Sequence, residues 1–206
     1  MRIILKPLGV VVIGAAMTIL AVMAVRGGQA SKSAPAAVSV AAPNATVAAA
    51  SSPGDIVYDN ALKNGWSDFS WAKHDLADSK QATPGMCIRV ESKKFEAVAF
   101  HHAALDMAPY DRVAFRIHGG DTGRQRLKLV AQYESGKEVK NATEHILPVL
   151  SAKEWKTVTV ALEDLGIANK ANVVGFWLQE GYGETLAPYY VDDIRLLRPS
   201  EMAPTP

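Results

Sequence analysis

The sequence predicts an all-β domain built as a two-sheet antiparallel sandwich. Apolar and polar residues alternate with a period of two in several segments, as in strands that bury one face. Gly, Pro, Asp and Asn separate these segments, as they separate the strands of a sandwich. No stretch carries a helical apolar stripe long enough for a strand–helix–strand unit, and the only helical feature expected is one turn at residues 163–167.

Four segments show the alternation most clearly. In residues 112–118, Val113, Phe115 and Ile117 face one way, whereas Arg116 and His118 face the other. The same rule predicts these inward residues in segments 126–134, 155–162 and 173–180: Leu127, Leu129, Ala131, Tyr133; Val158, Val160, Leu162; and Val174, Phe176, Leu178. Shorter strands are expected at residues 55–59, 71–76, 86–90, 97–101, 145–149 and 189–196.

The first 26 residues predict a membrane-targeting helix. Arg2 and Lys6 precede the uncharged apolar residues 7–25, and Arg26 follows them. A helix of this length spans roughly 28 Å, close to the thickness of the hydrocarbon core of a bilayer. The segment is either a retained signal anchor or a signal peptide cleaved near residues 28–30. Both interpretations place the remainder outside the cytoplasm, because the basic flank stays on the cytoplasmic side.

The composition divides the rest of the chain into a linker, one domain and a tail. Residues 27–54 are rich in Ala, Ser and Pro and contain no aromatic side chain, so we expect a disordered tether. The domain occupies residues 55–198, and residues 199–206 form a short tail. The net charge of +1 argues against a nucleic-acid partner, and the single cysteine, Cys87, rules out an intramolecular disulfide.

The order of motifs in residues 55–198 resembles that of carbohydrate-binding modules of the galactose-binding-like jelly-roll type. The motifs that carry the resemblance are GWSDFSW (65–71), WKTVTVALEDLG (155–166) and YYVDDIRLL (189–197). The resemblance implies a jelly roll in which the outward face of one sheet forms a concave groove for a sugar. It also implies a non-catalytic module that serves an enzyme absent from this chain.

Outward-facing aromatic and polar residues are the candidates for this groove. An indole such as Trp177 can stack on a pyranose ring, while Gln, Arg and His side chains hydrogen-bond to its hydroxyl groups. The alternative for each residue is a structural role, with the indole under a loop and the polar groups on a solvated face. The candidate set is Trp177, Gln179, Arg116, His118, Gln132, Trp71 and Tyr182.

Metal and catalytic sites have weaker support in the sequence. His101 and His102 are adjacent, so on a strand they face opposite ways, and the other histidines lack the spacing of zinc ligands. The resemblance implies a structural Ca²⁺ where the first and last strands meet, with Asp59 and Asp193 as candidate ligands. The alternative is that Asp193 accepts backbone N–H bonds at a sheet edge. No nucleophile motif or facing carboxylate pair indicates an enzyme.

The sequence therefore predicts a non-catalytic extracytoplasmic module that binds a poly- or oligosaccharide. It would be anchored at the bacterial envelope, or secreted if the N-terminal segment is cleaved. Its expected partners are a glycan, the membrane through the N-terminal segment, and a separate glycosidase or envelope protein. The alternative is an envelope protein-interaction or assembly domain, because one fold can serve several functions.

Overall fold

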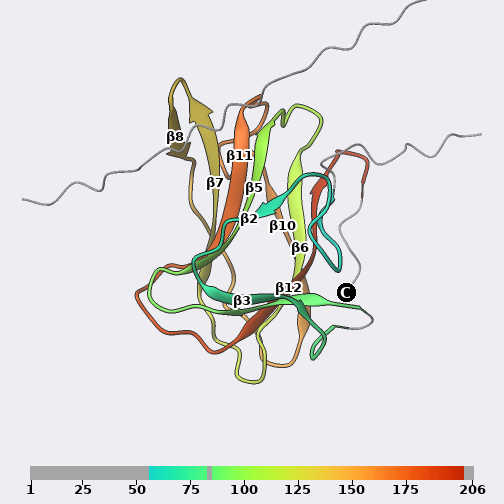
Figure 1. Cartoon of the computed structure of the whole chain (residues 1–206), viewed down its shortest axis with the longest axis vertical. Helices are drawn as coiled ribbons and strands as arrows, with labels where there is room; N and C mark the ends of the chain where they lie inside the picture. Colours follow the sequence, from blue (N-terminus) through green and yellow to red (C-terminus); the bar gives the residue numbers. More distant parts are fainter. Residues whose placement is uncertain (1–55, 83–84, 202–206) are drawn as a thin grey trace, which may run out of the picture. The chain divides into compact units, whose positions relative to one another are not determined.

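The computed structural model describes residues 56–82 and 85–201, which form twelve strands in two antiparallel sheets (Figure 1). Sheet A has the order β10-β6-β12-β4-β3, with β1 also paired to β12. Its strands are β1 (Ile56–Tyr58), β3 (Lys73–Asp78), β4 (Cys87–Glu91), β6 (Arg112–His118), β10 (Trp155–Ala161) and β12 (Tyr189–Leu197). The described residues therefore confirm the all-β prediction with two antiparallel sheets.

Sheet B has the order β2-β5-β11-β7-β8, with β9 also paired to β7. Its strands are β2 (Ser67–Asp68), β5 (Ala97–Leu105), β7 (Leu127–Ser135), β8 (Glu138–Asn141), β9 (His145–Ile146) and β11 (Val173–Glu180). Strands β5, β11 and β7 lie side by side in Figure 1 and form the centre of this sheet. The short strands β2 and β8 lack a clear alternation and were not predicted.

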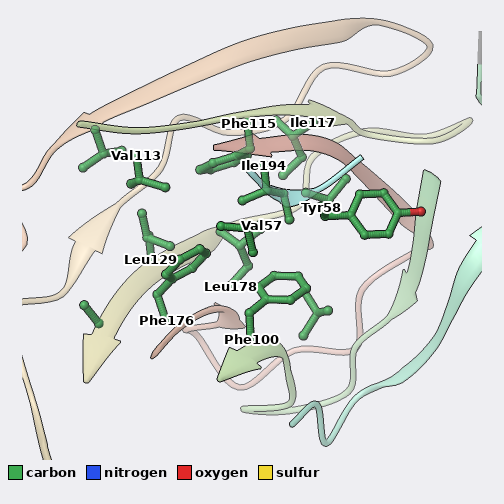
Figure 2. Close-up of a cluster of buried hydrophobic side chains, with 14 of the residues drawn as sticks. Val57, Tyr58, Phe100, Val113, Phe115, Ile117, Leu129, Phe176, Leu178 and Ile194 are labelled. Carbon is green, nitrogen blue, oxygen red and sulfur yellow. The ribbon is translucent and has the colours of Figure 1, made fainter. Parts of the chain in front are cut away.

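The hydrophobic core lies between the two sheets. Figure 2 shows Phe115 and Ile117 of β6 facing Phe100, Phe176 and Leu178 of sheet B. All five are at most 5% exposed. The inward residues predicted for strands β6, β7 and β10 all belong to this core or pack against it. Alternation with a period of two was therefore sufficient to identify most of the buried face of each long strand.

The main exception in the core lies at the start of β11. Val174 was predicted to face inward, but the core cluster contains Val173 instead. The ladders of β11 with β5 and β7 both shift register between Val173 and Gly175. Such a bulge adds one residue to a strand and reverses the facing of the residues before it. The prediction of Val174 as a residue of the main core was therefore wrong.

Two other expectations concern helices. Residues 162–166 form a turn after β10 rather than a helix. The predicted membrane segment and linker, residues 1–54, lie outside the described residues. No helix within residues 56–82 and 85–201 is long and apolar enough to cross a membrane.

Candidate functional site

The outer face of sheet B carries aromatic and polar side chains in three rows across its central strands. Trp177 faces away from the core because its neighbours Phe176 and Leu178 face inward. Antiparallel register brings residues of β7, β11 and β5 side by side in each row. The rows are Gln132, Gly175 and His101; Val130, Trp177 and Ala99; and Lys128, Gln179 and Ala97.

The segment between β2 and β3 lies along the edge of this face. The backbone N–H of Phe69 donates to the carbonyl of Ala99 at 3.0 Å, and the N–H of Trp71 donates to that of Ala97 at 3.0 Å. These bonds attach residues 69–71 to β5 before the chain enters sheet A as β3. Phe69 and Trp71 are 59% and 48% exposed, so they remain available to a ligand.

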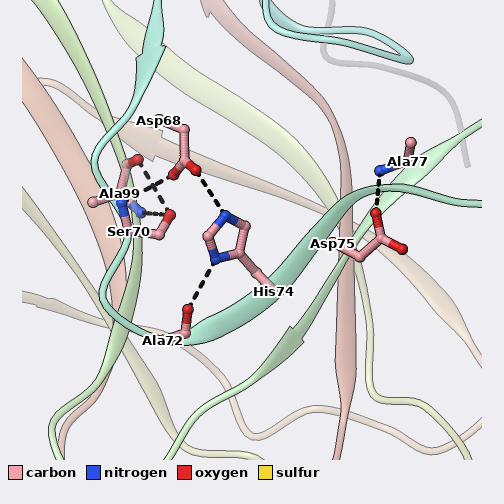
Figure 3. Close-up of polar contacts among 7 residues, drawn as sticks. All are labelled: Asp68, Ser70, Ala72, His74, Asp75, Ala77 and Ala99. Atoms are coloured by element: carbon pink, nitrogen blue, oxygen red, sulfur yellow. Dashed lines mark hydrogen bonds and ion pairs between the residues drawn. The ribbon is translucent and has the colours of Figure 1, made fainter.

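Polar contacts of Asp68, Ser70 and His74 hold this segment in place (Figure 3). The Ser70 hydroxyl accepts the N–H of Ala99 at 2.9 Å, and the Asp68 carboxylate accepts the N–H of Ser70 at 2.9 Å. The same carboxylate lies 2.7 Å from Nε2 of His74. Burial alone would raise the pKa of Asp68, but its bonds to Ser70 and His74 outweigh burial and lower it. Asp68 is therefore a charged anchor for the chain that carries Phe69 and Trp71.

Phe69, Trp71 and Trp177 form an aromatic wall beside a shallow depression. The rings of Trp71 and Trp177 meet edge to face with centroids 5.8 Å apart, and Phe69 stacks on His101 at 4.4 Å. The depression has a volume of about 140 Å³. Its lining contains no Asp, Glu, Lys or Arg and consists of Phe69, Trp71, Ala99, Phe100, His101, Gln132, Phe176 and Trp177.

Internal hydrogen bonds occupy the indole N–H groups of the aromatic wall. Nε1 of Trp71 donates to the carbonyl of Phe95 at 2.9 Å, and Nε1 of Trp177 lies 3.4 Å from Oε1 of Gln179. Among the described residues, by contrast, the imidazole of His101 has no hydrogen-bond partner. A ligand would therefore meet the ring surfaces of the wall and the polar nitrogens of His101.

The structure brings together three of the predicted site residues, namely Trp71, Trp177 and Gln132. The Gln132 amide donates to Oδ1 of Asn141 at 3.1 Å, which fixes its orientation at the rim of the depression. Gln179 lies one row away, and its amide donates to the carbonyl of Phe95 at 2.8 Å. Trp177 is only 7% exposed, because Trp71 covers it. The prediction of its outward direction is confirmed, but it is not a freely exposed ring.

Tyr182 lies outside the depression, in the loop after β11. Its ring contacts the guanidinium of Arg126 at 4.1 Å, and Arg126 also pairs with Glu184 at 2.5 Å. Tyr182 is 45% exposed. It therefore extends the aromatic surface of this loop without lining the depression itself.

Arg116 and His118 belong to sheet A, so they do not share a groove with Trp177. His118 was predicted to be exposed but is only 4% exposed, because the rings of Trp155 and Tyr190 pack beside it. Burial lowers the pKa of His118, and its Nδ1 accepts the N–H of Gly120 at 3.0 Å. The guanidinium of Arg116 lies 4.9 Å from the ring of Trp155. Alternation correctly placed both residues off the core face, but it could not show which sheet contains their strand.

The calcium prediction involves Asp59 and Asp193, near the pairing of β1 with β12. The Asp193 carboxylate lies 3.5 Å from Arg116 and 3.7 Å from Arg195, so two guanidinium groups already neutralise it. The described residues contain no group of three or more His, Cys, Asp or Glu side chains suited to a metal ion. This donor set does not fit a closed calcium site, and calcium stays a prediction of the sequence alone.

Sequence reasoning did not select Phe69 or His101 for the site. In segment 97–101 the outward positions are Ala97, Ala99 and His101, so small side chains lead up to one polar ring. This pattern was the available signal, since small outward residues leave room for a covering group. The position of Phe69 against β5 had no comparable signal, because β2 is only two residues long.

Solved carbohydrate-binding modules share this fold. The family 11 module from Clostridium thermocellum, in complex with a β-1,3-1,4-mixed-linked tetrasaccharide, matches with a TM-score of 0.55 and 13% identity over 70% of this chain and 95% of that chain. The family 11 module of a cellulosomal cellulase from the same organism matches with a TM-score of 0.51 and 14% identity over 74% of this chain and 99% of that chain. These likenesses confirm the jelly-roll fold expected from the sequence.

One curated relative also matches in sequence. An endoglucanase of Dictyostelium discoideum is 26% identical over 145 residues, which cover 67% of this chain. The chain spans only 20% of the length of that enzyme. No known family profile matches the chain. The fold of the described domain is therefore that of the carbohydrate-binding modules.

Proposed function

We propose that the outer face of sheet B binds an uncharged glycan. The depression beside the aromatic wall carries this proposal, because it combines ring surfaces with a partner-free imidazole. Sugar rings stack on aromatic side chains through their C–H faces, while their hydroxyl groups need directional polar partners. His101 and Gln132 would supply these partners. The absence of Asp, Glu, Lys and Arg from the lining favours a neutral sugar over a uronic acid.

The relatives support the class of ligand. A family 11 module with this fold was solved with a mixed-linked tetrasaccharide, and the curated relative is named as an endoglucanase. A soluble β-glucan is therefore the first ligand to test. In this proposal the domain binds without catalysis and the N-terminal segment places it outside the cytoplasm, at the membrane or in secreted form. A separate glycosidase is its expected functional partner.

Affinity electrophoresis in gels that contain mixed-linkage β-glucan tests this function. The wild-type protein is expected to be retarded, and Phe69→Ala/Trp71→Ala is expected to run as in a gel without polysaccharide. The matched control is Ile146→Ala/Val149→Ala, which removes two side chains that are 54% and 57% exposed but lie outside the depression. Equal retardation of both double variants would exclude this site.

The alternative function predicts a different set of results. A protein-interaction domain would give no retardation of the wild type by any neutral or acidic polysaccharide. It would instead recover one protein from an envelope fraction, with no effect of added oligosaccharide. That combination would replace the glycan proposal.

A further inference from the structure

Glu180, at the end of β11, is a buried carboxylate surrounded by backbone N–H groups. It is 0% exposed, and no ion pair in the described part of the chain includes it. Its Oε2 accepts the N–H of Phe95 at 3.0 Å and the N–H of Gly183 at 2.9 Å. Its Oε1 accepts the N–H of Tyr182 at 2.6 Å. One side chain therefore joins the turn before β5 to the loop after β11.

The hydrogen bonds keep this carboxylate ionised. Burial alone would raise the pKa of Glu180, but the backbone N–H groups of Phe95 and Tyr182, among others, outweigh burial and lower it. A buried charge without such donors would be strongly disfavoured. An amide could not replace it fully, because the NH₂ group of Gln donates hydrogen bonds and would face N–H donors. The arrangement is therefore specific for a carboxylate.

The residue that Glu180 holds has a strained backbone. Phe95 has φ of 60°, in the left-handed region that side chains other than Gly seldom adopt. Such a conformation persists only where neighbouring groups hold it. The bond from the N–H of Phe95 to Glu180 supplies one such restraint.

The carbonyl of Phe95 points back to the candidate site. It accepts Nε1 of Trp71 at 2.9 Å and Nε2 of Gln179 at 2.8 Å. Gln179 in turn lies within 3.4 Å of Nε1 of Trp177. A continuous path of hydrogen bonds therefore runs from Glu180 through the backbone of Phe95 to both indoles of the aromatic wall.

We propose that Glu180 is a positioning residue for the aromatic wall and acts through the backbone of Phe95. It holds the Phe95 carbonyl where that group orients Trp71 and Gln179. Fixing the rings before a ligand arrives lowers the entropy lost on binding. The effect on glycan affinity rests on the proposed function, whereas the effect on the indoles does not.

Glu180→Gln tests this role through the indole N–H signals of the full-length ¹⁵N-labelled protein in detergent micelles. We expect the Trp71 and Trp177 signals to shift and the protection of the Trp71 N–H from solvent exchange to fall about tenfold or more. Trp66 and Trp155 are internal references, since Trp66 is buried in the core and Nε1 of Trp155 donates to Gln81. Their signals should stay in place. Unchanged Trp71 signals, or equal loss at all four indoles, would overturn the proposal.

Two matched variants separate charge and side chain from position. Glu154→Gln removes a carboxylate whose side chain is 54% exposed, beside Lys156 on sheet A, and should leave all four indole signals unchanged. Phe95→Gly keeps the carbonyl and favours positive φ, so the Trp71 signal should also stay close to that of the wild type. A Phe95→Gly spectrum like that of Glu180→Gln would show that the side chain, not the backbone, positions the indole.

The wild-type protein provides a test if Glu180→Gln does not fold. The Phe95 amide and the Trp71 indole N–H should exchange with solvent through one common opening, with equal opening free energies. Unequal free energies would contradict the proposal. In the folded variant, affinity for mixed-linkage β-glucan should fall about tenfold. If the wild type binds no glycan but the indoles shift as expected, the positioning role stands and the proposed function fails.

Discussion

The indole rings of Trp71 and Trp177 meet edge to face, with centroids 5.8 Å apart and planes at 63°. Trp71 comes from the segment before β3 and Trp177 from the centre of β11, so this contact joins two parts of the chain that are distant in sequence. It covers Trp177, and it stands beside the depression that we propose as the glycan site.

This contact should contribute measurably to stability. Edge-to-face aromatic pairs add roughly 0.5–1.5 kcal/mol beyond the area that they bury. A double-mutant cycle with Trp71→Ala and Trp177→Ala, followed by urea unfolding, is expected to give a coupling free energy of about 1 kcal/mol. Additive effects of the two substitutions would show that the rings do not interact in solution.

The Ser70 hydroxyl should anchor the segment that carries Phe69 and Trp71. Ser70→Ala leaves the N–H of Ala99 without its partner at 2.9 Å, so we expect the free energy of unfolding to fall by about 1–2 kcal/mol. Glycan affinity should fall as well, because residues 69–71 become less ordered. Ser79→Ala, at an exposed serine of the same sheet-crossing region, is the control. Equal stability of the two variants would contradict the anchoring role.

Asp192 should make stability depend on pH. Burial raises its pKa to about 6 from an ordinary value of 3.8, with a further rise from the neighbouring Asp193 carboxylate. The folded state therefore binds more protons than the unfolded state between these values, and this contribution to stability decreases as the pH rises from about 4 to 6. Asp192→Asn cannot ionise, so relative to the wild type it should be more favourable at pH 7.5 than at pH 4. The expected difference is on the order of 1–3 kcal/mol.

Urea unfolding of the wild type and of Asp192→Asn at both pH values measures this difference. Other titrating groups are common to the two proteins and cancel in the comparison. The bond from the N–H of Asp193 to Oδ1 of Asp192, at 2.8 Å, can also form with the Asn carbonyl. A difference of zero, or one of the opposite sign, would show that Asp192 is not destabilised by ionisation.

Arg116 should have no part in glycan binding, since it lies in sheet A beside Trp155. Arg116→Ala is expected to lower the melting temperature, because Asp193 and the Trp155 ring both lose a partner. Its affinity for β-glucan, measured by isothermal titration calorimetry well below the melting temperature, should stay within about twofold of the wild type. A large loss of affinity in the intact fold would place a second glycan contact on sheet A.

Much of the fold was predictable because alternation is a local property. The period of two identified the strands that became β6, β7, β10 and β11, and it placed Phe115 and Phe176 in the core. It failed at Val174, where a bulge changes the count of residues on one strand. It also missed β2, which is held in the sheet mainly by pairing with β5 rather than by its own pattern.

The site was only partly predictable for a related reason. The direction of a side chain relative to its own strand follows from the sequence, and Trp177 and Gln132 were placed correctly on that basis. The groups that cover a face come from elsewhere in the chain. Trp71 shields Trp177, and Trp155 and Tyr190 shield His118, so outward direction alone did not give exposure.

The sequence by itself determined that this domain is all-β and which residues of its long strands leave the core. Only the tertiary structure decided which sheet contains each strand, and it thereby separated Arg116 and His118 from Trp177. It also decided that Glu180 and the strained backbone of Phe95 support the aromatic wall. The physical reason is that sheet pairing and hydrogen bonds to backbone groups depend on contacts between distant segments, which no local pattern records.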